Sequence, residues 1–415
     1  MTVPGSESSP WTLGDRLNVG DIGIGSLNVT AGGTVSNLVG SIGDKAGAQG
    51  TVTVDAAGGA ASWSNNGTLY VGNNGSGDLQ IANGGVVTST AGQVGMVAGS
   101  EGNVEVDGAG SSWTIASTAA TPVPGNLNIG NAGSGELSIT NGATVSNGAG
   151  NLGVAAGSTG KATVGTNGVW NNTGALTVGS LGSGELTILS GGAVNNAAGS
   201  IANGAGSTGT VTVSGAGSTW TNRGLVRVGG AANSNGTLVI NDGAAVTSTT
   251  GSLGAGTGAT GNATISGTGS SWKTTSGTFN VGGTGTGHLL IEDGGLLQNT
   301  GAPADPSAFG YSVIGSTDSS GATSTATVTG AGSTWSTDGI MTVGYMAAGD
   351  LQVLDGGTVT TKGVEMARNA RGSGNVTVAG ANSLLSSDGG FFRVGSFGTA
   401  DLTITDGGRV EVRGG

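Results

Sequence analysis

The chain repeats itself along its whole length, and this feature constrains its fold more than any other. The segment at residues 75–81 (GSGDLQI) returns with small changes at 133–139, 182–188 and 285–291, which gives a period of roughly fifty residues. A shorter period of about 25 residues lies inside it, and an apolar residue begins each short repeat. These residues are Leu27, Val52, Leu79, Val104, Leu137, Ala162, Leu186, Val211, Leu238, Ala263, Leu289, Ala326, Leu351, Val376 and Leu402. Such a period is typical of solenoid proteins, in which each repeat forms one coil.

Three short apolar segments recur within each repeat. In one repeat they lie at residues 186–188, at 193–194 and at Ile201, before the next repeat begins at Val211. Apolar and polar residues alternate within them, as in a strand that buries one face. Gly-Gly, Asn-Gly and Gly-Ser-Gly separate them, and we expect these to be corners where a positive φ favours glycine. Each coil is therefore predicted to contain three strands of two to four residues.

The connections between the strands determine the predicted topology. No helix-length amphipathic segment separates them, so a parallel neighbour can be reached only by going once around the coil. Parallel crossovers are strongly biased to the right-handed form. The sequence thus predicts an all-β fold: a right-handed, single-stranded parallel β-helix, or β-solenoid, of about fifteen coils. Nothing resembles a linker, so residues 1–415 are predicted to form one domain.

The second strand alternates between small and large side chains. Alternate coils carry Val35, Val87, Val145, Val194, Val246, Leu297, Val359 and Val410, and the others carry Trp63, Trp113, Trp170, Trp220, Trp272, Trp335 and Leu385. Indoles that interleave with valines would fill a core at high density. However, the Trp usually lies one residue later in its coil than the Val, and a slip of one residue would turn it outward. The sequence leaves open an outward Trp row, which would be a glycan-binding stripe.

Composition excludes several classes of function. The net charge is -12 with only 12 Lys and Arg, so a nucleic-acid partner is not expected. No apolar run approaches eighteen residues, so this segment is not expected to insert into a membrane. Cysteine is absent and His288 is the single histidine, which removes disulfides, thiolate or His-based metal sites and a Ser-His-Asp triad.

The acidic residues follow the repeat instead of clustering. Glu101, Glu105 and Asp107 form the densest group, but no Lys or Arg repeats beside them. Residues 72–79 resemble half of a calcium-binding nonapeptide, yet a period near 25 does not provide the tandem repeats that such a site needs. We therefore expect no catalytic residue, metal or cofactor. The alternative class is a carbohydrate-active β-helix enzyme, a lyase or hydrolase, or a glycan-binding module; an enzyme would need irregular polar residues at a cleft.

Several repeated patterns carry a resemblance to a known family. They are G-x-L-x-V-G at residues 67–72, G-x-L-x-I-x-x-G-G-x-V at 184–194, and GAGSTW at 215–220 and 330–335. They resemble the Gly-rich repeats in passenger domains of bacterial autotransporter adhesins, the type V secretion family. The resemblance implies export through an outer-membrane barrel of the parent chain and extracellular display at the bacterial cell surface. It implies a structural or adhesive rod whose partners are host-cell or matrix proteins or glycans, or other copies of the rod.

Two places lengthen the coil, at residues 115–125 and 301–312. Proline is excluded from central ladder pairing and restricts a loop's backbone, and solenoids carry binding loops on one face. We therefore expect these excursions to be the candidate binding loops. Their candidate residues are Pro122 and Pro124 in the first loop, and Pro303, Asp305, Phe309 and Tyr311 in the second.

Overall fold

The computed structural model describes residues 2–3, 10–116, 124–275, 278–301, 312–317 and 323–414. Every regular element in these ranges is a β-strand, which confirms the predicted all-β class. Each strand pairs in parallel with the strands three places before and after it in the chain. The fold is therefore a right-handed parallel β-solenoid of about fifteen coils, as predicted.

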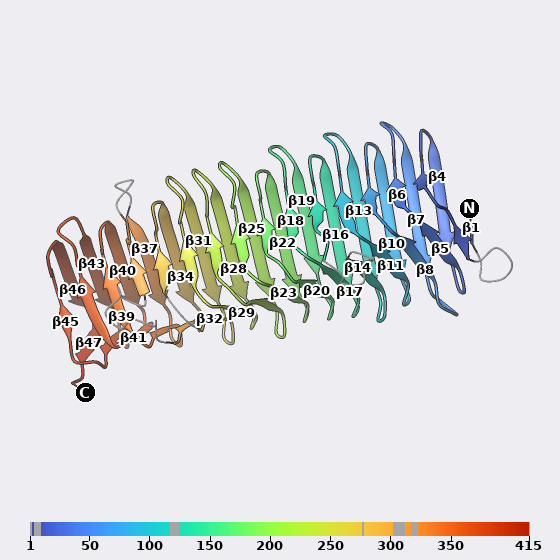
Figure 1. The fold of residues 1–415 in the computed structure, drawn as a ribbon. Coiled ribbons are helices and arrows are strands. Elements are labelled where there is room, and N and C mark those ends of the chain that lie inside the picture. The colour runs from blue at the N-terminus through green and yellow to red at the C-terminus, as the bar shows by residue number, and fades with distance from the viewer. Residues whose placement is uncertain are drawn as a thin grey trace. The chain divides into compact units, whose positions relative to one another are not determined.

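The chain divides into two compact units, Met1–Ala197 and Ala198–Gly415, which are described in turn. The prediction that residues 1–415 form a single domain stays a prediction. In each unit the first, second and third strands of successive coils stack into three separate sheets, here called the first, second and third sheet. Figure 1 shows neighbouring coils side by side within a unit, for example at β7 (Gln49–Asp55) and β10 (Ser76–Ala82).

The first unit contains β1 to β23. Its first sheet consists of β1 (Thr2–Val3), β4 (Ile24–Val29), β7, β10, β13 (Glu101–Asp107), β16 (Ser134–Thr140), β19 (Thr159–Val164) and β22 (Ser183–Leu189). Its second sheet consists of β2 (Trp11–Thr12), β5 (Thr34–Asn37), β8 (Ser62–Asn65), β11 (Val86–Ser89), β14 (Ser112–Ile115), β17 (Thr144–Asn147), β20 (Val169–Asn172) and β23 (Ala193–Asn196). Its third sheet consists of β3 (Arg16–Val19), β6 (Val39–Ile42), β9 (Thr68–Val71), β12 (Ala91–Val94), β15 (Leu127–Ile129), β18 (Gly150–Leu152) and β21 (Leu176–Val178).

The second unit contains β24 to β47. Its first sheet consists of β25 (Thr208–Ser214), β28 (Asn235–Asn241), β31 (Thr260–Ser266), β34 (Thr286–Glu292), β37 (Ser324–Thr329), β40 (Ala348–Leu354), β43 (Ser373–Ala379) and β46 (Thr399–Thr405). Its second sheet consists of β26 (Thr219–Asn222), β29 (Ala245–Ser248), β32 (Ser271–Thr274), β35 (Leu296–Asn299), β38 (Thr334–Thr337), β41 (Thr358–Thr361), β44 (Leu384–Ser387) and β47 (Arg409–Val412). Its third sheet consists of β24 (Gly199–Ile201), β27 (Val226–Val228), β30 (Gly251–Leu253), β33 (Phe279–Val281), β36 (Ser312–Ile314), β39 (Ile340–Val343), β42 (Gly363–Met366) and β45 (Phe392–Arg393).

The apolar residues that mark the short repeat form one buried column in each unit, except that Leu402 in the last coil is half-buried. Leu79 lies opposite Val52 on one side and Val104 on the other, and the register continues in this way from coil to coil. Leu79 and Leu137 are at most 2% exposed. The side chains stack because residues at equivalent strand positions pair with one another across neighbouring coils, which confirms the predicted repeat.

The first strands are longer than predicted. β10 has seven residues instead of the expected two to four, and it includes Ser76 and Gly77 of a Gly-Ser-Gly segment that the sequence indicated as a corner. Gly77 does not have a positive φ. Gly77 faces the inside of the coil, where a Cβ added to it would lie 2.3 Å from the amide nitrogen of Gly72. Glycine is needed there because the neighbouring corner approaches too closely for any side chain.

The indoles point into the core, and the outward Trp stripe is ruled out for the described coils. Trp63, Trp113, Trp170, Trp220, Trp272 and Trp335 are 0–1% exposed. Val87 lies opposite Trp113 because the extra residue is taken up in the corner before β14 and does not shift the strand. The Ser111 hydroxyl stabilises that longer corner: it donates to the Asp107 carbonyl (2.6 Å) and accepts from the Gly84 amide (2.9 Å).

A glycine in the third strand makes room for each of these indoles in the first unit. A Cβ on Gly40 would lie 2.9 Å from the ring of Trp63, and one on Gly150 would lie 3.0 Å from Trp170. In the first unit the coils that carry Trp have a leucine at this third-strand position, such as Leu69. Large and small residues therefore alternate in two strands at once, which keeps the core filled.

Candidate functional site

The two predicted binding loops fall mostly outside the described residues. Pro122, Pro303, Asp305, Phe309 and Tyr311 lie there, and their role stays a prediction. Pro124 is described: it is exposed and forms an antiparallel bridge with Ala116. This bridge closes the base of the first excursion at the end of the second strand, where the sequence located it.

The corner between the third and first strands offers a different candidate site. In the first unit its length alternates: residues 43–48, 95–100 and 153–158 form long corners of six residues, and residues 72–75 and 130–133 form short corners of four. Long corners extend beyond short ones, so a notch lies above each short corner and between two long ones. We call this row of corners the notched edge.

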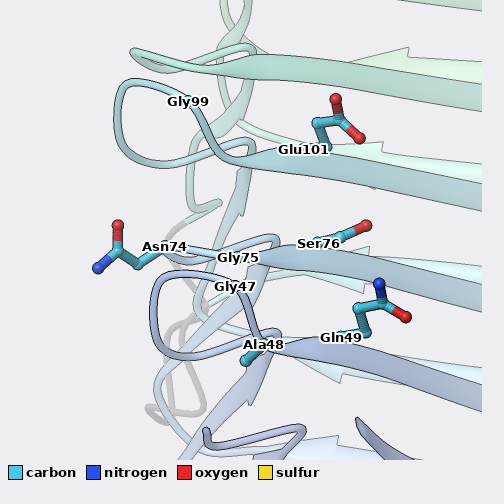
Figure 2. Close-up of a pocket in the computed structure, with 8 residues that line it drawn as sticks. All are labelled: Gly47, Ala48, Gln49, Asn74, Gly75, Ser76, Gly99 and Glu101. Atoms are coloured by element: carbon cyan, nitrogen blue, oxygen red, sulfur yellow. The ribbon is translucent and has the colours of Figure 1, made fainter. Parts of the chain in front are cut away.

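The first notch lies over the short corner at residues 72–75 (Figure 2). It has a volume of about 200 Å³, with Gly47 and Ala48 on one wall and Gly99 on the other. The floor is Asn74 and Gly75, and the Asn74 side chain points outward in Figure 2. Gly75 lies against the preceding long corner, because a Cβ there would be 2.3 Å from the Ala48 carbonyl oxygen.

A second notch repeats this construction two coils later. It has a volume of about 300 Å³, and its floor is Ala132 and Gly133. One wall is the long corner at residues 95–100, and the other includes Gly157. The wall at 95–100 is held in shape by Ser100, whose hydroxyl donates to the Val97 carbonyl (2.7 Å) and accepts from the Val97 amide (3.1 Å). The notches are therefore features of an ordered backbone.

One column of outward side chains runs along both notches at the start of the first strands. Gln49, Ser76 and Glu101 are successive members of this column, and Ser134 and Thr159 continue it. Figure 2 shows the first three on the same side of their strands. All are amide, hydroxyl or carboxylate groups that can hydrogen-bond a polar ligand.

Carboxylates line the adjoining part of the first sheet. Asp78, Glu101 and Glu136 border a third depression of about 180 Å³, together with the polar side chain of Asn103. Asp78 lies opposite Asn103, which in turn lies opposite Glu136, so these two acids are two coils apart. The Asn103 amide donates to Asp78 at 3.5 Å. The acids at this position alternate with Thr51, Asn103 and Lys161 along the sheet, and all of them lie within the first strands.

These carboxylates do not converge on one point. Within the described ranges no group of three or more His, Asp and Glu side chains is placed to hold a metal ion. Glu101 and Glu105 project from one strand four residues apart, and they face solvent. The arrangement suits hydrogen bonding to hydroxyl or amino groups spread along the surface.

A buried carboxylate anchors the first long corner. Asp44 is 2% exposed and accepts hydrogen bonds from Ser41 (2.6 Å) and Asn73 (2.9 Å). It also pairs with Lys45 at 2.9 Å and with Arg16. Burial alone would raise the pKa of Asp44. The surrounding hydrogen bonds and positive charges outweigh it and hold the pKa well below its usual range. The wall of the first notch is thus attached to the coils on both sides.

Sequence reasoning missed the notched edge. The signal was present as the alternation between short segments such as GNNGS and long segments such as GMVAGSE, but only the alternation of Val and Trp was used. His288, the single histidine, lies on the outward side of its strand, where its Nδ1 is 2.8 Å from the Thr325 hydroxyl. None of the elements in the described part of the chain is a helix that could span a membrane.

Comparisons with known proteins give limited similarity. No family model matches the chain. The uncharacterized lipoprotein YdeK of Escherichia coli (strain K12) is 37% identical over 76 residues, which are 18% of this chain and 6% of that protein. The chain thus spans a small part of the length of this relative.

A solved structure resembles the chain as a whole. It is the crystal structure of a TibC-catalyzed hyper-glycosylated TibA55-350 fragment, with 16% identity, a TM-score of 0.44 and coverage of 99% of both chains. The fold assignment rests on the strand pairing of the chain itself.

Proposed function

We propose that this chain is a passenger segment of an autotransporter-type protein, displayed outside the bacterial cell as a structural and adhesive β-solenoid. The observation that carries the proposal is the regular outward surface: in each unit the same strand positions face solvent coil after coil. A solenoid presents such a surface as an extended binding face. The Gly-rich repeats resemble those of this family.

The site geometry favours adhesion over catalysis. Catalytic sites usually bury most of a substrate in a concave pocket with a few converging polar groups. Here the depressions at the notched edge are open, and their carboxylates are spread over several coils. Many weak contacts along a repeating surface suit a multivalent adhesive role. We therefore propose no catalytic activity for this segment.

Surface display can be tested by placing residues 1–415 between a secretory signal and the barrel of an unrelated autotransporter. We expect the segment to reach the surface of intact cells, where antibody and added protease detect it, because each coil needs only its neighbour to fold. Cells that display it should adhere to host-cell layers or matrix better than cells that display an unrelated β-solenoid. Retention inside the cell, or adhesion equal to that control, would contradict the proposal.

The enzyme alternative has its own test. The purified chain is incubated with pectin, alginate and neutral β-glucans, and new reducing ends and the absorbance of unsaturated products are measured. We expect neither to rise. Product formation that Glu101→Gln abolishes would replace the adhesive function with a catalytic one.

A further inference from the structure

We infer that the notched edge of the first unit binds an extended, neutral β-1,4-linked polysaccharide, with one disaccharide repeat at each notch. This inference rests on the proposed adhesive function and names the chemical class of its ligand. It starts from the two-coil period of the notches and from the groups that line them.

The period of the notches selects the kind of polymer. Equivalent notches are two coils apart, which is about 10 Å at the usual spacing between strands. In an extended β-1,4-linked chain each pyranose ring is turned over relative to the previous one, so the same face returns at every second ring. Two such rings span nearly the same distance as two coils. An extended peptide repeats at roughly 7 Å and would lose register with the notches.

The lining of the notches selects a neutral, hydroxyl-rich chain. Gln49, Ser76 and Glu101 border the first notch, and Glu101, Ser134 and Thr159 border the second. These groups accept hydrogen bonds from sugar hydroxyls, and the Gln49 and Asn74 amides can also donate them. Among the described residues that line the two notches none is Lys or Arg. The Glu101 carboxylate between them would repel a polymer of uronic acids.

The ordered walls support binding without rearrangement. Ser100 and Ser158 are 1–2% exposed, and each hydroxyl donates to a carbonyl within its own long corner at 2.7 Å. Gly133 and Gly182 lie as close to the preceding long corners as Gly75 does. A backbone held in this way loses little conformational freedom when a ligand docks, which favours affinity. Each notch is shallow, so one disaccharide should bind weakly and a longer chain much more tightly.

The second unit provides an internal control. Three successive corners of this unit, at residues 202–207, 229–234 and 254–259, are long, so no short corner lies between them to form a floor; its four-residue corners come later, at residues 282–285 and 344–347. Asn235 occupies the same strand position as Ser76 and is also outward, but it follows one of these long corners. A bulky side chain at residue 235 therefore fills no notch.

The test uses isothermal titration calorimetry of the whole chain with cellobiose, cellohexaose, chitohexaose and the β-1,3-linked laminarihexaose. We expect the β-1,4-linked hexaoses to bind at least about tenfold more tightly than cellobiose because they engage both notches. Laminarihexaose, which lacks the two-ring repeat, should bind no better than cellobiose. Equal affinity for the two linkages would overturn the inference.

Variants locate the binding. The double variant Ser76→Tyr with Ser134→Tyr puts bulky outward side chains directly beside both floors and should weaken cellohexaose binding at least about tenfold. The matched variant Asn235→Tyr should leave it unchanged. Circular dichroism confirms that each variant keeps its strands. Unchanged binding in the double variant, or no binding of any β-1,4-linked hexaose to the folded chain, would refute the inference. If displayed cells still adhere in that case, the adhesive function stands and only its assigned ligand is wrong.

Discussion

The two units share a core and differ at the surface. Both keep the same inward columns in register, with Leu79 between Val52 and Val104 in the first unit and Leu238 between Val211 and Ala263 in the second. At the corner before the first strand, long and short segments alternate in the first unit, whereas in the second unit three long corners follow one another before short corners return at residues 282–285 and 344–347. Corner length can change without shifting the strands.

The outward faces differ in the same way. The strand positions that carry Asp78, Glu136 and Glu185 in the first unit carry Thr210 and Thr237 at the start of the second, and acids return there only at Asp350 and Asp401. Side chains at these positions point away from the core. The fold therefore does not require the alternating corner lengths or the acidic residues of the first unit. The comparison indicates that the outer surface is where the two units are free to serve different roles.

The largest effect is expected from removing a buried indole. Trp170→Ala in the first unit and Trp272→Ala in the second should each cost about 3–5 kcal/mol, because the surrounding coils cannot fully close the cavity. Trp272 also packs edge-on against Phe279, with ring centroids 4.9 Å apart, and its substitution removes this aromatic contact as well. Hydrogen exchange, followed separately for the amides of each coil, measures the loss of stability around both residues. Trp170→Phe, which removes the bond from Nε1 to Asn147 (2.7 Å), is the milder control. Unaltered protection in Trp170→Ala would show that the shared core is not what stabilises the coils.

A smaller effect is expected at the inward glycine column of the first strands. Gly102→Ala would place a Cβ 2.2 Å from the Val71 carbonyl oxygen and should destabilise the first unit by about 1–3 kcal/mol. The second unit already carries Ser324 in this column, beside Gly349. Its hydroxyl accepts from the Gly287 amide at 3.2 Å. Ser324→Gly gives the residue that this column carries elsewhere, as at Gly349, so it introduces no clash and loses only this hydrogen bond; it should cost less than Gly102→Ala. Thermal unfolding of both variants measures the two changes in stability. Equal effects of the two substitutions would contradict the prediction.

The Asp44 network predicts an acid-sensitive edge in the first unit. The pKa of Asp44 is lowered in the folded chain, so its contribution is full above the ordinary carboxyl pKa near 4 and declines as the pH falls below it. Asp44→Asn should cost about 1–3 kcal/mol at pH 7, and the difference from the unchanged chain should shrink in acid. Hydrogen exchange of residues 43–55 at pH 7 and pH 3 measures it. A constant difference at both values would contradict the assigned role, and the second unit serves as the reference.

The smallest effect is expected for an exposed ion pair. Lys161 Nζ lies 3.5 Å from Glu185 Oε2, and both side chains are more than half exposed. Lys161→Ala should change stability by less than about 0.5 kcal/mol, like a substitution at Thr210 in the matching position of the second unit. A larger loss, sensitive to salt in a melting experiment, would mean that surface charge stabilises the first unit more than the second.

Much of the fold followed from the sequence because its causes repeat. The inward residues recur at fixed offsets, and so the column through Leu137 and Leu186 could be predicted without a structure. The Trp orientation could not, because an offset alone does not reveal whether an extra residue lies in a strand or in a corner. Ser111 shows the difference: its two hydrogen bonds hold the additional residue outside the strand.

The candidate site was predicted less well because it depends on relative lengths and not on conspicuous residue types. Proline and aromatic residues drew the sequence prediction to the loops around Pro122 and Phe309. The notches are lined instead by common residues such as Ser76 and Gly99, and only the difference in length between neighbouring corners distinguishes them. The depth of a notch depends on the difference in corner length between neighbouring coils. A search for unusual residues within one coil does not detect such a difference.

The ladder spacing has a consequence for how the chain reaches its folded state. Contacts between neighbouring coils join residues close in sequence: Trp63 and Asn37 are 26 positions apart, and Trp113 and Ser89 are 24 apart. The relative contact order is therefore low, and each new coil closes a loop of nearly the same length at nearly the same entropic cost. A chain that emerges end-first from a narrow opening can add one coil at a time to those already formed. A folded coil would have to unfold before the chain could move back through the opening. Folding of successive coils can therefore favour movement of the chain in one direction.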